Sequence, residues 1–556
     1  MQDYFNLGGY EFPVTTDSRE AQIWFDRGLA WVYGFNHDEA AACFRKAADS
    51  DPDCAMAYWG EAYACGPFYN MTWEHFSEHE TIEATGVCYR AAQSALAHAD
   101  PASCLEQSLI AALARRYQKD HPVGLEEFTA WNDAYADAMR DVYTRFPDHL
   151  DVIALTAEAL VTRTPWMLWN VATGVPAQDT DTLEAIAILE SGLRIIEERG
   201  EIQHMGMLHI YLHALEMSPT PEKALWAADA LYDLSPDNAH LQHMPAHIYV
   251  LCGRYADAIK VSDTAITADD KYVEHAGPYN FNAVNRGHDL LMKIHAGMLA
   301  GRLEPTIQAV NQLIDRLPED LLRIDKPYLA ILLEGYLSAT EHVPVRFGRW
   351  QSIIDSETRT DPVLYPTTIA MSRYARGIAY SATGQIEAAQ QERSLFLEAL
   401  ALISPERIMG NNPTVDVLAV GEQMLDGELN YRQRNYDVAF DHLREAVRRN
   451  DNLNFSEPWP WMHPPRHALG ALLMEQGQFE EAEQVYRADL GLDNSIPRCQ
   501  QHPDNVWSLH GYVECLKHRG NRLELTTMEP LLARALGVAD IPINASCCCR
   551  TEVRCG

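Results

Sequence analysis

The chain has 556 residues, 47% of them hydrophobic, so it can bury a large core, or several stacked small ones, without crosslinks. Its formal net charge of −35 would repel nucleic-acid phosphates and anionic membrane surfaces, which argues against both as partners. The N-terminus lacks a basic start and an apolar run, and nowhere do about 18 apolar residues follow one another. We therefore expect a cytoplasmic protein.

The first predicted structural element is a pair of antiparallel helices over residues 23–52. Small and aromatic residues recur in this stretch at the spacing of a tetratricopeptide repeat, in which small residues let two helices approach and aromatic residues fill the gaps. The residues at these positions are Trp24, Gly28, Trp31, Ala40, Phe44, Ala47 and Pro52.

Further copies of the repeat are indicated by a turn followed by alanines. They are "GRYADAI" at Gly253, "GQIEAAQ" at Gly384, "RNYDVAF" at Arg434 and "GQFEEAE" at Gly477. Apolar residues near these turns recur with a spacing of about 3.6, and no sustained alternating strand pattern appears. The predicted fold is all-α, a tetratricopeptide-repeat solenoid, or superhelix, that could close into a compact ring.

Four segments are predicted along this solenoid. N-terminal helical repeats cover residues 1–160, central repeats cover 161–310, and C-terminal helical repeats cover 311–540. Residues 541–556 are expected to be a disordered, cysteine-rich tail, although its four cysteines could alternatively bind a soft metal such as Cu(I). Long segments with loop composition begin at Arg163, Asp270 and Asn452 and are expected to be either packing plugs or lids.

A pair of histidines is repeated after 34 residues in the central segment. His209 and His213 of "HIYLHALE" recur as His243 and His247 of "HMPAHIYV". Residues three, four and seven apart share one face of a helix, so Glu216 joins the first pair. His240 joins the second in the same way. We expect the two helices to face each other at a distance of roughly 8–10 Å, which side chains can close onto one ion.

A third helix is predicted to contribute to the same face. Matching the turn at Gly301 to the turn at Gly253 is a shift of 48 residues, which places His288 at the position of His240 and His295 at that of His247. In tetratricopeptide repeat proteins this face of the first helix lines the concave groove. The resemblance therefore implies a histidine-rich patch where ligands bind in this fold.

These histidines have two interpretations. Neutral imidazoles bind zinc, copper, iron and nickel, and Glu216 beside two or three of them would also suit a facial-triad Fe(II) site. Alternatively, buried histidines hydrogen-bond one another and backbone carbonyls, as a metal-free cluster for proton transfer or binding. We favour a metal site because seven histidines share the face.

Six longer stretches of the chain have a distinctive pattern: "YGFNHDEAAACF" at Tyr33, "DPDCAMAYWGEAYACGP" at Asp51, "PWMLW" at Pro165, "HIYLHALEMSP" at His209, "HLQHMPAHIYVLCGRY" at His240 and "EPWPWMHPPRHALGALL" at Glu457. In these stretches, and over nearly its whole length, the chain resembles a large, mostly uncharacterised microbial family of tetratricopeptide repeat proteins. The resemblance implies that the family's characteristic polar residues here are His209, His213, Glu216, His240, His243, His247 and His288. The chain departs from the family pattern at two positions, Leu291 and His295.

The predicted function is a metal-dependent enzyme acting on a small organic molecule in the groove. An oxidative reaction with copper or iron is expected ahead of a hydrolytic reaction with zinc. Glu216 is the candidate general base, and Arg466 could hold a substrate carboxylate. The alternative is a scaffold that binds a peptide or protein partner without catalysis, and a third hypothesis is metal storage by the histidines and the cysteine tail.

Overall fold

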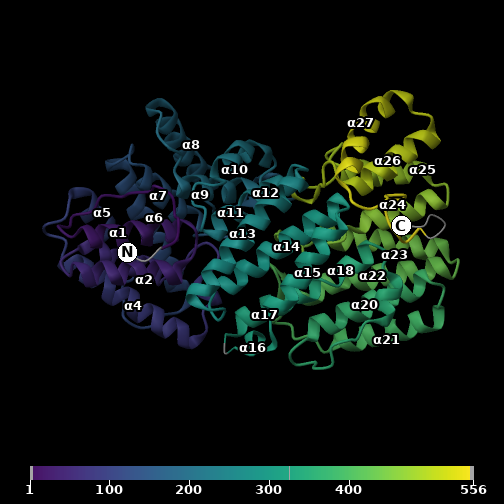
Figure 1. Cartoon of the computed structure of the whole chain (residues 1–556), viewed down its shortest axis with the longest axis horizontal. Coiled ribbons are helices and arrows are strands. Elements are labelled where there is room, and N and C mark those ends of the chain that lie inside the picture. The colour runs from purple at the N-terminus through teal and green to yellow at the C-terminus, as the bar shows by residue number, and fades with distance from the viewer. Residues whose placement is uncertain (1–3, 325, 551–556) are drawn as a thin grey trace. The chain divides into compact units, whose positions relative to one another are not determined.

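The computed structural model describes residues 4–324 and 326–550, which form an almost entirely helical protein (Figure 1). Strands within these residues form two short antiparallel pairs. β1 (Trp169–Asn170) pairs with β2 (Val175–Pro176), and β3 (Ile408–Met409) pairs with β4 (Asn412–Pro413). The predicted all-α fold class is confirmed.

The helices are divided between two compact units. Unit 1 comprises the described residues up to Ile248 together with Thr264–Asn282, and unit 2 comprises Tyr249–Asp263 and the described residues from Ala283 onward. The chain passes from one unit to the other within α12 (Pro245–Leu251) and α13 (Tyr255–Ala276).

Unit 1 consists largely of consecutive helices that pack in pairs, α1 with α2, α3 with α4, α5 with α6 and α7 with α8. The bounds are α1 (Arg19–Tyr33), α2 (His37–Ser50), α3 (Ala55–Ala64), α4 (Glu78–Ala97), α5 (Cys104–Leu113), α6 (Leu125–Arg145), α7 (Leu150–Val161), α8 (Thr182–Arg199), α9 (Met205–Glu216), α10 (Leu225–Leu231) and α11 (Ala239–His243), with the 3₁₀ helices η1 (Trp73–His75) and η2 (Pro221–Ala224).

The first predicted repeat corresponds to α1 and α2. Ser18 and Asn36 accept hydrogen bonds from backbone N–H groups in the first turns of these two helices, and so begin them. Phe44 of α2 lies against Gly28 of α1 and Gly60 of α3. A Cβ atom at Gly28 or Gly60 would lie 2.6 or 2.2 Å from the Phe44 ring. The glycines therefore permit the close helix approach that the repeat pattern predicts.

Unit 2 continues the pairing, with α20 against α21, α22 against α23, α24 against α25 and α26 against α27. The bounds are α14 (Asn282–Ala300), α15 (Leu303–Arg316), α16 (Glu319–Leu322), α17 (Pro327–Ala339), α18 (His342–Arg346), α19 (Trp350–Asp355), α20 (Pro366–Ala382), α21 (Ile386–Ala401), α22 (Thr414–Arg432), α23 (Tyr436–Asp451), α24 (Pro465–Glu475), α25 (Phe479–Asp489), α26 (Val506–Arg519) and α27 (Arg522–Val538), with the 3₁₀ helix η3 (Arg498–Gln500).

The turns that mark the predicted repeats share one backbone conformation. Gly253, Gly384 and Gly477 have φ values of 74°, 77° and 70°, in the left-handed region that favours glycine. Arg434 occupies the equivalent turn between α22 and α23 with a φ of 65°. The turn geometry is therefore kept even where the sequence has no glycine.

The structure differs from the sequence-based expectation in two segments. Most of the loop expected from Asp270 is helical, because α13 continues to Ala276 and α14 begins at Asn282. The tail expected to be disordered from residue 541 is packed into unit 2 as far as residue 550. Cys547, Cys548 and Cys549 are each 4% exposed. Cys555 lies outside the described residues.

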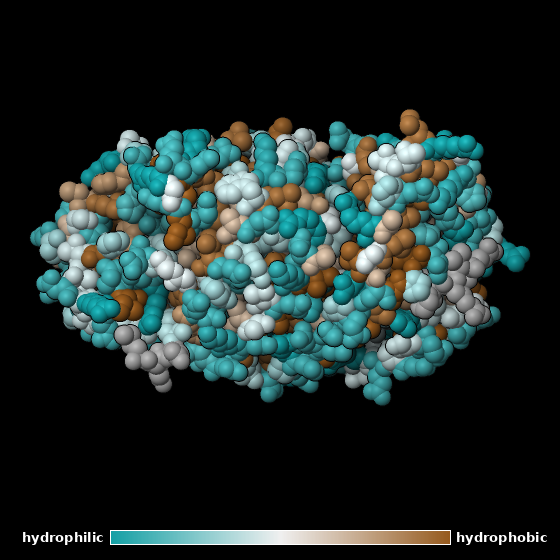
Figure 2. All heavy atoms as spheres, turned by 45° about the horizontal axis from the view of Figure 1, so that its top comes forward, coloured by the Kyte–Doolittle hydropathy of each residue, from teal (hydrophilic) through white to brown (hydrophobic). Residues whose placement is uncertain are grey.

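One face of the surface can be compared with the polar composition of the chain. Hydrophilic residues cover most of the face drawn in Figure 2, with apolar residues interspersed among them. Of the helices in the described ranges, none combines the length and the apolar character needed to cross a lipid bilayer.

Candidate metal centre

Unit 1 brings together five of the seven predicted histidines. His209 and His213 lie on α9, His240 and His243 lie on α11, and His247 lies on α12. None of these side chains is more than 4% exposed. α11 ends at His243 and α12 begins at Pro245, so the single helix expected here is broken between His243 and His247.

The C-terminal end of α1 contacts two of the three histidine-bearing helices, α9 and α11. The last carbonyls of a helix have no partner within it. Here the Ala30 carbonyl accepts a hydrogen bond from the Asn238 amide, 3.1 Å away, at the start of α11. The Tyr33 carbonyl lies 2.6 Å from Nδ1 of His209. Gly206 lets α9 approach this end, because a Cβ atom there would lie 2.4 Å from the Tyr33 ring.

Hydrogen bonds determine which ring nitrogens carry the protons. A carbonyl only accepts, so His209 donates from Nδ1 to Tyr33 and keeps a lone pair on Nε2. Glu216 lies 2.8 Å from Nδ1 of His213 through Oε1 and 2.8 Å from Nδ1 of His247 through Oε2. The carboxylate accepts a hydrogen bond from each of the two rings. This is the arrangement by which acidic residues orient metal-binding imidazoles.

Three of the imidazoles form a compact group. His209, His213 and His240 each offer one ring nitrogen, and the three nitrogens all lie within 4.8 Å of one another. Burial lowers the pKa of His209 well below its usual value of 6.5, and the neighbouring His213 lowers it further. His209 is therefore neutral at pH 7, the state in which imidazole binds metals.

The other two histidines extend the hydrogen-bond network. Nε2 of His243 lies 2.6 Å from Nε2 of His247. Because His247 donates from Nδ1 to Glu216, its Nε2 accepts a hydrogen bond from Nε2–H of His243. Oε2 of Glu216 therefore accepts from His247, which in turn accepts from His243. Oε1 of Glu216 accepts from His213. This arrangement assigns Glu216 an orienting role.

Aromatic side chains enclose the three-histidine group. The Phe35 ring centroid lies 4.3 Å from that of His209, and Phe35 stacks on His213 at 5.7 Å. Tyr69 and Trp166 lie 4.7 and 5.9 Å from the His213 ring. This wall excludes water from the imidazoles. These aromatic residues are not among the predicted site residues, although Phe35 and Trp166 lie in the motifs "YGFNH" and "PWMLW".

Two of these aromatic residues have a strained backbone. Phe35 has a φ of 54° and Trp166 a φ of 62°. The left-handed region disfavours a bulky side chain, at a cost of about 1–3 kcal/mol for each residue. Such strain persists where the surroundings enforce it, and it clusters at functional sites. Both strained residues here contact the same histidine ring.

The remaining predicted site residues belong to unit 2. His288 and His295 lie on α14, and the His295 ring is 6.3 Å from that of His502. Arg466, expected to hold a substrate carboxylate, instead binds the Asp451 carboxylate through two hydrogen bonds of 2.6 and 2.7 Å. A bidentate pair of this kind fixes Arg466 in place.

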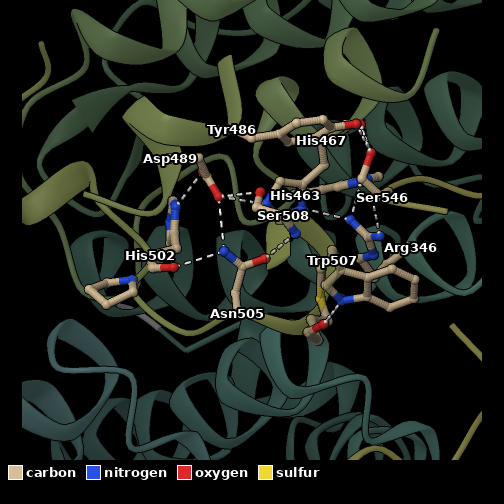
Figure 3. Close-up of polar contacts among 12 residues, drawn as sticks. Arg346, His463, His467, Tyr486, Asp489, His502, Asn505, Trp507, Ser508 and Ser546 are labelled. Carbon is tan, nitrogen blue, oxygen red and sulfur yellow. Dashed lines mark hydrogen bonds and ion pairs between the residues drawn. The ribbon is translucent and has the colours of Figure 1, made fainter. Parts of the chain in front are cut away.

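A second buried histidine network occupies unit 2 (Figure 3). His467 donates from Nε2 to Asp489, 3.0 Å away, and its Nδ1 accepts from the Arg346 guanidinium at 2.9 Å. Asp489 also accepts from His502, at 2.9 Å. Burial alone would raise the pKa of Asp489, but the neighbouring His467 and His502 lower it well below its usual range. The second Arg346 nitrogen donates to the Ser546 carbonyl at 2.8 Å.

Comparison with known proteins supports the repeat. Residues 466–498 match the tetratricopeptide repeat model. These residues include all but the first residue of α24, the whole of α25 and the turn at Gly477, which the sequence predicts to be one copy of the repeat. No curated protein sequence matches the chain.

Several solved helical structures align with the chain at low similarity. The apo form of RapI is 12% identical, with 64% of this chain and 93% of RapI covered and a TM-score of 0.31. The human IFIT1 dimer with m7Gppp-AAAA is 12% identical over 95% of this chain and 92% of IFIT1, with a TM-score of 0.31. Yeast Tom70 is 10% identical over 93% and 92%, with a TM-score of 0.28.

Proposed function

We propose that unit 1 is a metal-dependent enzyme whose transition-metal ion is held by the imidazoles of His209, His213 and His240. The observation that carries this proposal is the convergence of three buried ring nitrogens within 4.8 Å. Further support comes from the hydrogen bonds at Nδ1 of two rings. His209 donates to the Tyr33 carbonyl and His213 donates to Glu216, which makes Nε2 the metal-binding nitrogen of both rings. Three protein ligands leave a coordination position for a substrate.

The residue types favour an oxidative reaction on a small organic molecule. Sets of imidazoles suit copper and iron as well as zinc, and an open position on copper or iron would supply oxidative chemistry. A hydrolytic reaction with zinc is the second expectation. The aromatic wall of Phe35, Tyr69 and Trp166 would keep water away from the ion. Glu216, with both oxygens engaged by histidines, acts as a positioning residue in place of the general base expected from the sequence.

A scaffold that binds a peptide without catalysis is the second candidate function. It is favoured by the tetratricopeptide repeat at residues 466–498, since such repeats commonly recognise peptides. The net charge of −35 would select an apolar or basic partner. The two candidates differ in whether the purified protein holds a metal.

Metal analysis by mass spectrometry separates these functions. The protein is purified without a histidine tag or a metal column and compared with His213→Ala, His240→Ala and the control His121→Ala, which changes an exposed histidine. We expect roughly one equivalent of copper, iron or zinc in the wild type and the control, and its loss in the two site variants. Full retention in both variants contradicts the ligand assignment. A metal-free wild type, even after reconstitution, supports the scaffold.

Glu216→Gln tests the positioning role in the same preparation. Glutamine keeps the size of the side chain but cannot accept both Nδ1 protons through two charged oxygens. We expect the affinity for the metal, measured by competition with a chelator, to fall about 10- to 100-fold, as for other residues that orient metal ligands. An unchanged affinity with a reduced reaction rate would instead support Glu216 as a general base.

A further inference from the structure

Unit 1 contains a cavity away from the three-histidine group. Its volume is about 340 Å³, which suits a small organic molecule. The cavity lies between the N-terminal segment around Tyr10, the start of α7 and the start of α9. We call it the Asp151 pocket. Its lining includes Gly9, Tyr10, Asp148, His149, Asp151 and Gln203.

One oxygen of the Asp151 carboxylate is fully engaged by the protein. Oδ1 accepts hydrogen bonds from the Tyr33 hydroxyl at 2.7 Å, from Nε2 of His204 at 3.0 Å and from the Tyr10 hydroxyl. Nδ1 of His204 accepts from the backbone N–H of Met207 at 3.2 Å, so the proton of this imidazole is on Nε2. The side chain is held rigidly at the first turn of α7, where the helix dipole favours a negative charge.

The other oxygen has no hydrogen-bond donor among the described residues. Nδ1 of His149 approaches Oδ2 only to 3.8 Å, which is too long for a hydrogen bond. Burial lowers the pKa of His149, so at neutral pH this ring does not supply a cation to the carboxylate. Oε1 of Gln203, which also lines the cavity, is a second buried acceptor without a donor in the part of the chain that the structure describes.

The charged residues that line the cavity are mostly acidic, which favours a cationic ligand. Asp148 and Glu11 line it together with Asp151, against one cation, Arg199. Asp151 is 6% exposed, and its interactions with His204 and the two tyrosines outweigh the effect of burial, so that its pKa is lowered and the carboxylate stays charged. Oδ2 of Asp151 is therefore a buried, charged acceptor. A hydrogen-bond donor in the cavity would offset the free-energy cost of its desolvation.

We propose that the Asp151 pocket binds a small organic cation with N–H donors, a primary ammonium or a guanidinium group. The cation would donate to Oδ2 of Asp151 and to Oε1 of Gln203, and the remainder of the molecule would lie in the cavity. Tyr33 connects the pocket to the three-histidine group, since its hydroxyl donates to Asp151 and its carbonyl accepts from His209. Binding of the cation does not depend on a metal.

Titration calorimetry with four probes tests the chemistry. Butylammonium and butylguanidinium carry a charge and N–H donors, tetramethylammonium carries a charge without donors, and butyrate carries the opposite charge. We expect heat of binding from one or both of the first two, which also identifies the preferred head group, and none from the others. Equal binding of tetramethylammonium or butyrate, or no binding of any probe, overturns the proposal.

Three variants locate the binding site. Asp151→Asn removes the charged acceptor, whereas the control Asp148→Asn removes an equal charge from an exposed residue of the same cavity. We expect Asp151→Asn to weaken binding of the preferred probe by at least about tenfold, and the control by much less. Gly9→Phe fills the cavity with Asp151 intact, and a Cβ atom at Gly9 meets no atom within 4 Å, so this variant should fold.

Loss of binding in Gly9→Phe supports the pocket even if Asp151→Asn proves unstable. Unchanged binding in Gly9→Phe places the cation elsewhere and overturns the assignment. The metal content of Gly9→Phe, measured in parallel, should equal that of the wild type. A failure of the metal proposal and a failure of the cation proposal can therefore be told apart.

Discussion

Buried histidines in this protein differ in what their ring nitrogens contact. His209 and His213 donate from Nδ1 to fixed acceptors, the Tyr33 carbonyl and the Glu216 carboxylate. His467 uses both nitrogens, one for Asp489 and one for Arg346, and therefore belongs to a closed structural network. His342 is fully buried, and neither ring nitrogen has a hydrogen bond to the described residues. Spacing in the sequence cannot distinguish these three situations, because it places a side chain on a face without naming its partner.

Because His342 is buried without a hydrogen bond to the described residues, we expect unit 2 to lose stability in acid. Burial lowers its pKa from 6.5 to about 3, so between these values the unfolded chain binds a proton that the folded chain does not. Stability therefore falls as the pH falls through this range, by about 2 kcal/mol for this group between pH 7.5 and pH 5. In denaturant titrations at both pH values, followed by tryptophan fluorescence, His342→Leu should lose less stability than the wild type. An equal loss in the two proteins contradicts this assignment.

At the scale of helices, the repeat motif indicates where neighbouring helices pack closely. Glycine at positions 28 and 60 leaves space on α1 and α3 for the single ring of Phe44. The motif residues could be recognised in the sequence because the close approach of neighbouring helices demands small side chains at a regular spacing. The break between α11 and α12 at Pro245 and the continuation of α13 to Ala276 depend on contacts beyond the local pattern.

Gly60→Val should destabilise unit 1. A Cβ atom at this position would lie 2.2 Å from the Phe44 ring, so either the ring or α3 must move. Overpacking of this kind costs typically about 1–3 kcal/mol. We expect a lower thermal midpoint by circular dichroism. Gly124→Ala is a suitable control, since a Cβ atom there meets nothing within 4 Å. Equal midpoints for Gly60→Val and the control would show that the helices separate without cost.

For the molecule as a whole, the C-terminal segment is part of unit 2. Ser546 accepts from Arg346 through its carbonyl, and its hydroxyl lies 2.7 Å from that of Tyr486. Arg432 donates to the Cys549 carbonyl. The cysteine-rich composition suggested a disordered end, because local sequence does not show that two distant arginines bind the backbone of this segment.

Deletion of residues 546–556 should therefore weaken unit 2. The deletion leaves the buried guanidinium of Arg346 without the Ser546 carbonyl, and loss of one hydrogen bond to a buried charged group costs on the order of 2 kcal/mol. Calorimetry should show a lower unfolding temperature for one transition. The metal content should remain that of the full chain, since the proposed ligands lie in unit 1. A metal content that falls with the deletion would instead implicate the cysteines in storage.

The sequence by itself determined the all-α class, the paired helices with their turns, and the histidine pairs on one face, because all three follow from periodic spacing along a helix. Tertiary structure decided which side chains meet. It joined His209, His213 and His240 at the end of α1, paired Arg466 with Asp451 and enclosed a carboxylate in the Asp151 pocket. Such contacts join residues far apart in the chain, and their distances depend on how helices pack, which no local pattern encodes.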